Sequence, residues 1–397
     1  MQAAQPSRID LIDSLRGFAL LGLFLVHMVE LFELYWAHPT PSPVVDWVFG
    51  LFAGKAFALF ALCFGLSFYI IMQRAAARGV AFGGRFVWRL AILLGFGLIH
   101  GLLYRGDILQ VLAPLGLALL LFDKVQSIRT LFLLALLCFV QPPLIVRFLA
   151  ALQDVGWAIA SPRFLTDPTL AVLTDGTLAQ TLRANLVDGQ MVKWWFFIET
   201  GRLTQILGLF LVGLALGRSG FFETPQRYVT ARRLVLAASL LLYAGLTLWQ
   251  APLLAAAPAG GGKAMGRQSL QWILESWAAL SLMTAQLVLF VELYEGFAGK
   301  VLRLLAPAGR MTLTLYLGQS LVFVPVFYGF GLHQHDRMSE GTALALGLVA
   351  FALQLVFAHL WFRRFHYGPC EWLWRALTYT TLDVPFVRKT RPALAMG

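Results

Sequence analysis

Ten long apolar runs dominate the sequence and leave little room for any fold other than a bundle of membrane-crossing helices. They occupy residues 17–36, 48–72, 90–104, 108–122, 130–149, 194–216, 234–253, 270–294, 311–332 and 342–362. Most approach the roughly 20 residues that a helix needs to cross a bilayer core. Lipid cannot satisfy backbone N–H and C=O groups, so such runs must be helical. We therefore expect an all-α, polytopic membrane protein with about ten transmembrane helices, some of them short.

The composition excludes two other classes of protein. Only 13% of the residues are charged and 59% are hydrophobic, whereas a soluble domain carries about 25% charged residues. An ordinary soluble enzyme and a disordered chain are both excluded. The net charge of +11 could suit nucleic acid, but the basic residues flank the apolar runs, so we expect lipid and no nucleic acid as partner. The three cysteines, Cys63, Cys138 and Cys370, form no disulfide or zinc pattern.

The distribution of basic residues predicts the orientation. The N-terminus, the C-terminal segment and the connections on one side hold 21 of the 31 Lys and Arg residues. The short connections on the other side hold only Arg105, Lys263, Arg267 and Arg337. Because basic residues stay in the cytoplasm, both termini should be cytoplasmic and the long polar segment 150–192 should face outward. We expect a helical bundle over 1–362 and a cytoplasmic segment over 363–397.

The C-terminal segment predicts a helix that lies on the membrane rather than across it. Residues 369–379 begin with Gly-Pro and an acid, as helix starts often do. Eleven residues reach only about 16 Å, against a core of ~30 Å. Trp372 and Trp374 suit the headgroup level. Glu371 and Arg375 are spaced as an i, i+4 ion pair.

The first apolar run carries two polar side chains on one face. Arg16 and His27 are eleven residues apart, which places them within about 20° of each other and roughly 16 Å apart along a helix. A guanidinium suits phosphate, and an imidazole titrates near neutral pH. We expect one cavity, open to the cytoplasm at Arg16, that reaches His27. Spacing alone leaves open that both side chains are only structural.

The third run ends in a second polar group. His100 and Asp107 are seven residues apart, on either side of Arg105 and Gly106. Ionisable groups at membrane depth default to functional hypotheses. A role for His100 and Asp107 and a purely structural Arg105–Asp107 ion pair are both left open. Gly97 in the same run permits a close helix contact.

Two further polar groups allow both a structural and a functional interpretation. Lys55 begins the second run and either snorkels to the boundary or faces a cavity. Glu199, Arg202 and Gln205 recur at helical spacing, which is typical of an internally paired seam and also of a substrate site.

A short loop holds two histidines and an aspartate. The stretch His333-Gln334-His335-Asp336 could contact a metal ion, but it lacks a helical His-Glu-x-x-His frame. We expect no metal site and no metal cofactor.

Five motifs together resemble one family. They are LIDSLRGFALLG at 11–22, GKAF at 54–57, HG with GDIL at 100–109, GRMTLTLYL at 309–317 and GPCEWLWR at 368–375. In this order they resemble the YeiB family of bacterial multi-pass membrane proteins, with matches from residue 8 to about 380. The resemblance implies a bacterial cytoplasmic (inner) membrane location.

The YeiB family is similar to the transmembrane acyltransferase superfamily, which includes heparan-α-glucosaminide N-acetyltransferase. Those enzymes move an acyl group from cytosolic acyl-CoA to a sugar across the membrane. The glycan acyltransferases of the superfamily carry Arg-x10-His on the first span, and Arg16 and His27 match that spacing. Most YeiB relatives have Asn where this chain has His27, so the chain departs from them toward the enzyme-like residue.

The resemblance implies a hypothesis for the chemistry. His27 would act as general base on a hydroxyl or amine, assisted by His100 and Asp107. Four basic residues would hold acyl-CoA: Arg16, Lys55, Arg310 and Arg375. The expected acceptor is an envelope glycan or a lipid-linked compound. A transporter or flippase of an anionic or amphipathic solute, a non-catalytic membrane-complex subunit, and a homo-oligomer all remain open.

Overall fold

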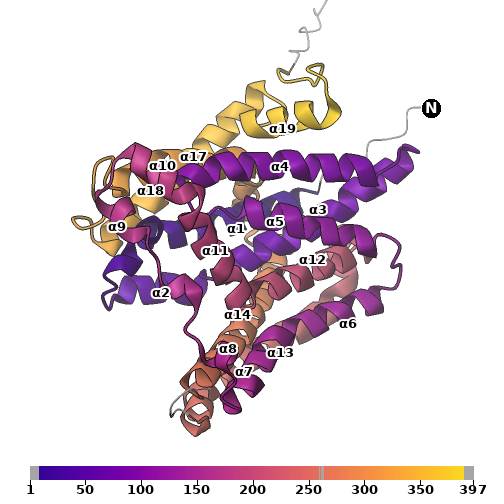
Figure 1. The fold of residues 1–397 in the computed structure, drawn as a ribbon. Helices are drawn as coiled ribbons and strands as arrows, with labels where there is room; N and C mark the ends of the chain where they lie inside the picture. Colours follow the sequence, from indigo (N-terminus) through magenta and orange to yellow (C-terminus); the bar gives the residue numbers. More distant parts are fainter. Residues whose placement is uncertain (1–8, 259, 261–262, 389–397) are drawn as a thin grey trace, which may run out of the picture.

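The computed structural model describes residues 9–258, 260 and 263–388, and their regular structure is helical (Figure 1). Arg8, Lys389 and Arg391, which entered the charge argument, lie outside the described residues. The helices are α1 (Asp10–Val29), η1 (Leu31–Ala37), α2 (Pro43–Leu51), α3 (Lys55–Ala77), α4 (Gly83–Leu103), α5 (Leu109–Gly116), η2 (Leu117–Phe122), α6 (Ile128–Phe139), α7 (Pro142–Leu152), α8 (Gly156–Ile159), η3 (Arg163–Leu165), α9 (Leu170–Asp175), α10 (Leu178–Leu186), α11 (Asp188–Glu199), α12 (Arg202–Arg218), η4 (Pro225–Tyr228), α13 (Val229–Ala256), α14 (Lys263–Glu295), α15 (Gly299–Leu302), η5 (Arg303–Leu305), α16 (Ala306–Arg310), α17 (Thr312–Phe327), α18 (Glu340–Arg364) and α19 (Pro369–Tyr379).

The predicted all-α, polytopic architecture is confirmed. Within the described residues, seven helical stretches are long and apolar enough to cross a membrane, or up to nine if each of two bent helix pairs counts as one span. The one remaining expected run, 108–122, forms α5 and η2, and this stretch, Leu109–Phe122, is a shorter apolar helix. At 1.5 Å per residue its 14 residues reach about 21 Å, less than a bilayer core of ~30 Å.

Several expected runs are interrupted where the backbone adopts a left-handed conformation. Gly54 separates α2 from α3 at φ 77°, and Gly201 separates α11 from α12 at φ 71°. Gln141 has φ 64° and is followed by Pro142, which starts α7. A proline suits the first position of a helix because its missing N–H would be unpaired there. The apolar pattern continues across these breaks, which is why the sequence predicts unbroken spans.

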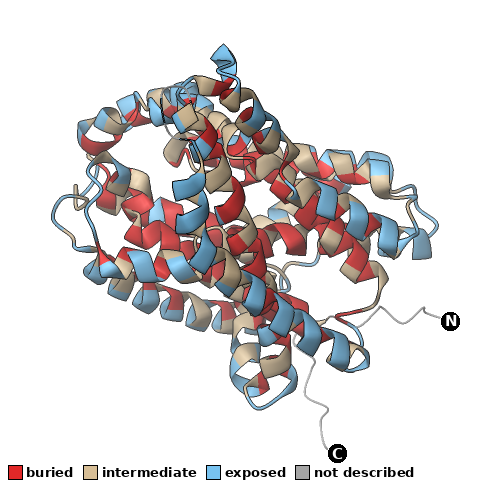
Figure 2. Ribbon diagram, turned by 90° about the horizontal axis from the view of Figure 1, so that it is seen from below, coloured by how far each residue is buried: buried red, intermediate tan, exposed pale blue. Residues whose placement is uncertain are grey.

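Helix α1 lies at the centre of the bundle. In its most apolar stretch 78% of the residues are buried, whereas only 6% of the residues are buried in the corresponding stretch of α13. Figure 2 shows buried residues gathered in the interior and exposed residues on the outward surfaces of the surrounding helices. A helix that is apolar and exposed suits contact with lipid, because lipid tails solvate apolar side chains. Functional groups on α1 therefore lie in the protein interior.

Close packing of α1 against the segment before α17 depends on two glycines. A side chain at Gly309 would overlap the backbone oxygen of Asp13, and one at Gly17 would overlap that of Leu305. Small residues let helix backbones approach closely in membranes. This contact places the N-terminal end of α1 against α16.

The predicted C-terminal helix is present with the predicted bounds, Pro369–Tyr379. In Figure 1, α19 lies beside α4 near the top of the bundle. The Trp374 indole donates to the backbone oxygen of Arg89 at 2.9 Å, and the Arg89 guanidinium lies 3.6 Å from the centre of the Trp374 ring. The helix is thus attached to the N-terminal turns of α4, and its position at the membrane interface stays a prediction.

Glu371 does not form the predicted pair with Arg375. Its carboxylate accepts the backbone N–H groups of Leu313 at 2.7 Å and Thr314 at 3.1 Å, and the Thr314 hydroxyl at 2.6 Å. Burial raises the pKa of the Glu371 carboxyl, and the hydrogen bonds from Thr314 and Leu313 oppose that rise. The first N–H groups of a helix need partners, so Glu371 joins α19 to the start of α17.

Replacing Glu371 by Ala is expected to loosen this junction. The change leaves the N–H groups of Leu313 and Thr314 without their acceptor, and a hydrogen bond to a charged group contributes about 1.5–3 kcal/mol. We expect a loss of that order in the free energy of unfolding, measured by denaturant titration in detergent micelles. Glu371→Gln keeps one acceptor oxygen and should lose less. Equal stability of wild type and Glu371→Ala would contradict the assignment.

Candidate active site

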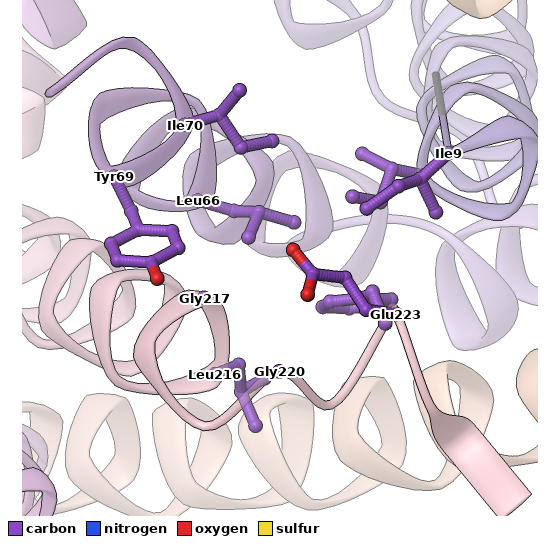
Figure 3. Close-up of a pocket in the computed structure, with 10 residues that line it drawn as sticks. Ile9, Leu66, Tyr69, Ile70, Leu216, Gly217, Gly220 and Glu223 are labelled. Carbon is purple, nitrogen blue, oxygen red and sulfur yellow. The ribbon is translucent and has the colours of Figure 1, made fainter. Parts of the chain in front are cut away.

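Arg16 lies at the start of α1 and is already engaged by protein groups. Its guanidinium donates to Asp13 at 3.1 Å and to the Ser67 hydroxyl of α3 at 2.5 Å. A cavity of about 10 Å³ lies between Ile12 of the same helix, Leu66 of α3 and Leu216 of α12. The Glu223 carboxylate points into it (Figure 3). That volume suits one water molecule, and an acidic lining disfavours phosphate. This cavity therefore has no space for a nucleotide.

The expected cavity between Arg16 and His27 is not present in this structure. Leu20 and Leu23 lie on the same face of α1 between them by helical spacing, and both are buried, at 0% and 9% exposure. The helical arithmetic placed the two polar groups on one face. The prediction of a continuous channel was wrong because apolar side chains fill that interval.

His27 lies in an aromatic environment near the end of α1. Its ring centre is 5.2 Å from that of Phe32 in η1 and 5.3 Å from that of Tyr104, which follows α4. The side chain is buried. No hydrogen bond joins its imidazole to the part of the chain that the structure describes. His27 therefore faces the protein interior rather than lipid.

His100 and Asp107 form a buried pair across the turn from α4 to α5. The His100 Nδ1 is 2.7 Å from Asp107 Oδ2, and both side chains are at most 3% exposed. The other Asp107 oxygen accepts the Gln110 backbone N–H at 2.9 Å. Because a carboxylate accepts, His100 Nδ1 carries the proton and Nε2 keeps a lone pair. That Nε2 is buried and has no hydrogen-bond partner among the described residues.

Two tyrosines connect these groups. The Tyr104 ring centre lies 5.9 Å from that of His100, so Tyr104 contacts both imidazoles. Tyr316 of α17 packs 5.1 Å from His100, and its hydroxyl accepts the Ile108 backbone N–H at 3.2 Å. Helices α1, α4 and α17 thus bring one cluster together, which we call the histidine cluster: His27, His100, Tyr104, Asp107 and Tyr316.

Arg105 does not pair with Asp107, the structural alternative considered from the sequence. Its Nε donates to Glu33 Oε2 at 3.0 Å, and its Nη1 contacts Asp167 and donates to the Thr169 hydroxyl at 2.6 Å. The Tyr104 hydroxyl donates to the other Glu33 oxygen at 3.0 Å. These contacts connect segment 150–192 to the histidine cluster, and Asp107 pairs with His100 instead.

Sequence reasoning missed Glu33, which is a central residue of this network. The first apolar run looked like a helix continuing to Trp36, but Leu31, Phe32 and Glu33 have φ of 49°, 48° and 83°. Non-glycine residues rarely adopt this conformation and do so where the surrounding structure holds them. The Tyr328 hydroxyl donates to the Phe32 oxygen at 3.3 Å. Three consecutive such residues turn Glu33 back toward Arg105.

The other predicted donor-binding residues do not gather at the histidine cluster. Lys55 donates to the backbone oxygen of Phe49 at 3.0 Å. The Arg310 guanidinium lies 3.9 Å from the centre of the Phe362 ring, and that of Arg375 lies 4.5 Å from that of Tyr367. Each of these three cations thus contacts a protein group, and a shared role in binding the donor stays a prediction.

The expected seam of Glu199, Arg202 and Gln205 is divided by the break at Gly201. Glu199 accepts from the Phe164 N–H at 3.5 Å, and Gln205 donates to the Ser276 hydroxyl at 3.4 Å. Arg202 instead faces aromatic rings. The three side chains do not pair along one helix.

A larger cavity, of about 430 Å³, lies between the N-terminal end of α4 and the end of α19. Arg85, Trp88 and Tyr379 are among its lining residues, and Arg85 also lies 5.3 Å from the centre of the Tyr379 ring. Arg85 and His100 are fifteen residues apart on α4, or about 22 Å at helical rise. This cavity is therefore separate from the histidine cluster.

The fold and the histidine cluster define a polytopic helical membrane protein with a buried histidine–carboxylate pair. Two protein-family models match the chain: "Heparan-alpha-glucosaminide N-acetyltransferase, catalytic" over residues 8–180 and "Protein of unknown function (DUF418)" over residues 216–381. The chain is 27% identical to the uncharacterized protein YxaH of Bacillus subtilis, covering 98% of this chain and 100% of the relative. It is 28% identical to the uncharacterized protein YeiB of Escherichia coli, covering 96% and 98%.

The chain is similar to the YeiB protein over nearly its whole length, as its motifs predict. Its N-terminal part is acyltransferase-like in sequence. The matched residues 8–180 include four members of the histidine cluster, namely His27, His100, Tyr104 and Asp107.

Proposed function

We propose that the protein is a membrane acyltransferase that takes an acyl group from cytosolic acyl-CoA and delivers it to a hydroxyl or amine of an envelope acceptor. The observation that carries this proposal is the His100–Asp107 pair with its unpartnered, buried Nε2. An imidazole oriented by a carboxylate through one nitrogen and free at the other is the arrangement of a general base. The acyltransferase-like match over the same residues supports it.

In the proposed reaction, His100 Nε2 removes the proton of the acceptor O–H or N–H. The acceptor atom attacks the thioester carbonyl, the new ester or amide bond forms, and the C–S bond breaks. The released thiolate takes up a proton, from the imidazolium or from solvent. Asp107 stabilises the imidazolium and holds the ring by its Nδ1, as the carboxylate does in catalytic triads.

His27 has a second role in this proposal. Sequence analysis predicts it as the base, but its imidazole lacks the carboxylate partner that His100 has. A general base is usually held in place by a hydrogen bond from its other ring nitrogen, which His100 has and His27 lacks among the described residues. We therefore assign the base to His100 and place His27, with Tyr104, against the acyl group or acceptor.

Donor entry requires the interior to open, because Leu20 and Leu23 fill the space below His27. Such gating motions commonly accompany catalysis in enclosed sites. A donor that passes the cytoplasmic end of α1 would meet Arg16, whose guanidinium can leave Asp13 and Ser67 for phosphate.

The first test measures release of free thiol from acyl-CoA by the purified protein in detergent, with envelope extract as acceptor source. Wild type should release thiol, and Arg16→Ala should raise KM for the donor by about tenfold with kcat largely kept, because it removes a charge-assisted phosphate contact. Arg129→Ala, an exposed residue outside this region, is the matched control and should leave KM unchanged. If no wild-type preparation releases thiol, the proposal that acyl-CoA is the donor is wrong.

Transport is the alternative, and the bent helices bear on it. Transporters often use helices broken near the midplane of the membrane. Here α11 and α12 meet at 69°, and the α15–α16 segment meets α17 at 77°. Helices α12 and α17 have 17 and 16 residues, about 24–26 Å each, which is most of a ~30 Å bilayer core. If each of these helices crosses the core by itself, its break lies near a membrane boundary, which favours an enzyme over a transporter with a midplane site.

The proposed reaction also requires an orientation, with both termini cytoplasmic in a bacterial inner membrane and 150–192 outside. Reporter fusions at Asp175 and after Gly397 should therefore report opposite sides of the membrane, because the basic residues are concentrated on the terminal side. A fusion in the 218–229 connection serves as a control and should match Gly397. The same side for Asp175 and Gly397 would overturn this topology.

A further inference from the structure

Outside the histidine cluster, the structure brings together four side chains that can bind a metal ion. His333, His335 and Asp336 lie in the connection between α17 and α18, and their ligand atoms all lie within 4.8 Å of one another. Asp175, at the end of α9, adds a fourth group, because its Oδ1 lies 4.0 Å from His333 Nε2. Asp336 Oδ2 lies at the same distance from that nitrogen. The sequence showed only the three neighbouring residues.

One ring nitrogen of His335 is hydrogen-bonded to a backbone carbonyl, as is common for histidines that bind metal ions. Its Nδ1 lies 3.2 Å from the backbone oxygen of Phe327. Metal-bound histidines usually donate their other ring N–H to a carbonyl or carboxylate, which fixes the tautomer and leaves a lone pair for the metal. With Nδ1 donating to Phe327, His335 presents Nε2 as a ligand atom.

The backbones that carry these residues are held together independently of any ion. The Gly329 N–H donates to the Leu173 oxygen at 3.0 Å, which joins the connection to α9. A side chain at Gly329 would overlap the Thr174 oxygen, so the two segments are in direct contact. The Thr174 hydroxyl donates to Asp175 Oδ2 at 2.8 Å and orients that carboxylate.

We propose that His333, His335, Asp336 and Asp175 form a divalent transition-metal site, best suited to Zn²⁺, on the side of the protein that carries segment 150–192. Two imidazoles and two carboxylates are a ligand set that Zn²⁺ accepts in tetrahedral geometry. Imidazole ligands disfavour Mg²⁺ and Ca²⁺, which prefer oxygen. The proposal departs from the expectation of no metal, because Asp175 and the Phe327 contact were not visible in the sequence.

The distances require only small movements. Ligand atoms around tetrahedral zinc lie about 3.4 Å apart, from bond lengths of about 2.0–2.1 Å. The two 4.0 Å separations from His333 Nε2 must therefore close by about half an ångström, and a separation of up to 4.8 Å within the loop must close by more. The side chains of Asp175 and Asp336 are 76% and 54% exposed, so both can move. Bound metal would link segment 150–192 to the α17–α18 connection.

The test uses the full-length protein in detergent, stripped of metal with a chelator and then titrated with Zn²⁺ alone. Wild type should bind one Zn²⁺ per chain, and the double variant His333→Ala/His335→Ala should bind it at least tenfold more weakly. Asp175→Asn should also weaken binding and should abolish zinc protection of segment 150–192 against proteolysis. His38→Ala, at an exposed histidine outside this cluster, is the control and should bind as wild type does.

Two results would overturn the proposal. One is equal Zn²⁺ affinity in wild type and in a double variant whose metal-free melting temperature matches that of wild type. The other is unchanged Zn²⁺ affinity and unchanged protection against proteolysis in Asp175→Asn, which would show that Asp175 is not a ligand. Ca²⁺ and Mg²⁺ are run beside Zn²⁺, and stronger binding of either would contradict the assigned metal class. These readouts are independent of acyl transfer.

Discussion

Replacing His100 by Ala is expected to lower the rate of acyl transfer by about 10²–10⁴-fold, the usual contribution of a positioned general base. The change removes the Nε2 lone pair that has no other partner in the described structure. Asp107→Asn should cause a loss of similar size, because a neutral amide neither fixes the Nδ1 proton nor stabilises the imidazolium. The measurement is kcat at saturating donor with purified protein.

The matched control for His100 is His359, a second histidine within an apolar helix. Its Nδ1 lies 2.8 Å from the Leu355 oxygen of the same helix, α18. His359→Ala should keep activity within about twofold, since it removes no group of the histidine cluster. If His100→Ala, folded as judged by its melting temperature, keeps wild-type kcat while His27→Ala loses it, the base is His27 and our assignment is wrong.

Replacing Arg105 by Met is expected to destabilise the protein by about 3–5 kcal/mol, the cost of breaking a buried ion pair by removing one partner. Arg105 is the cation that Glu33 and Asp167 share, and its side chain is only 6% exposed. Without it the two carboxylates lose the cation that both contact. The free energy of unfolding, measured by denaturant titration in micelles, reports the loss.

Two further variants make the Arg105 prediction specific. Adding Glu33→Gln to Arg105→Met should recover part of the stability, because one of the two orphaned charges is removed. Arg183→Met, at an exposed position of α10, should change stability by less than about 0.5 kcal/mol. Equal losses for Arg105→Met and Arg183→Met would contradict the buried network.

The parts of the fold that depend on local pattern could be predicted from the sequence. Apolar length predicted the helical bundle, and the Gly-Pro start with its acid predicted α19. The breaks could not be predicted in this way, because Gln141 adopts φ 64° within an apolar stretch. Such a conformation is decided by tertiary packing rather than by hydropathy.

The sequence singled out His27, His100 and Asp107, but it did not predict how these side chains are connected. Helical spacing placed Arg16 and His27 on one face, yet it gave no information about Leu20, which fills the space between them. Glu33 was missed because its partner Arg105 lies 72 residues away. A single sequence carries little signal for a contact of that separation. His100 and Asp107 are only seven residues apart, so the sequence could at least draw attention to both.

The network around Arg105 relates segment 150–192 to the proposed chemistry. Asp167 lies in that segment, and Glu33 contacts both Arg105 and Tyr104. Tyr104 in turn packs against both imidazoles. An acceptor arriving on the side of segment 150–192 would therefore meet a charged network that contacts the histidine cluster through Tyr104.

The most direct test of the central claim follows the acyl group itself. Inverted membrane vesicles containing the protein are supplied with acyl-CoA labelled in its acyl group, beside vesicles containing His100→Ala. We predict that wild-type vesicles transfer the label covalently to an envelope acceptor and release one free thiol for each acyl group transferred, and that the variant vesicles do neither. Label that enters the vesicles on an uncleaved donor, or transfer that is equal in wild type and His100→Ala, would contradict the account.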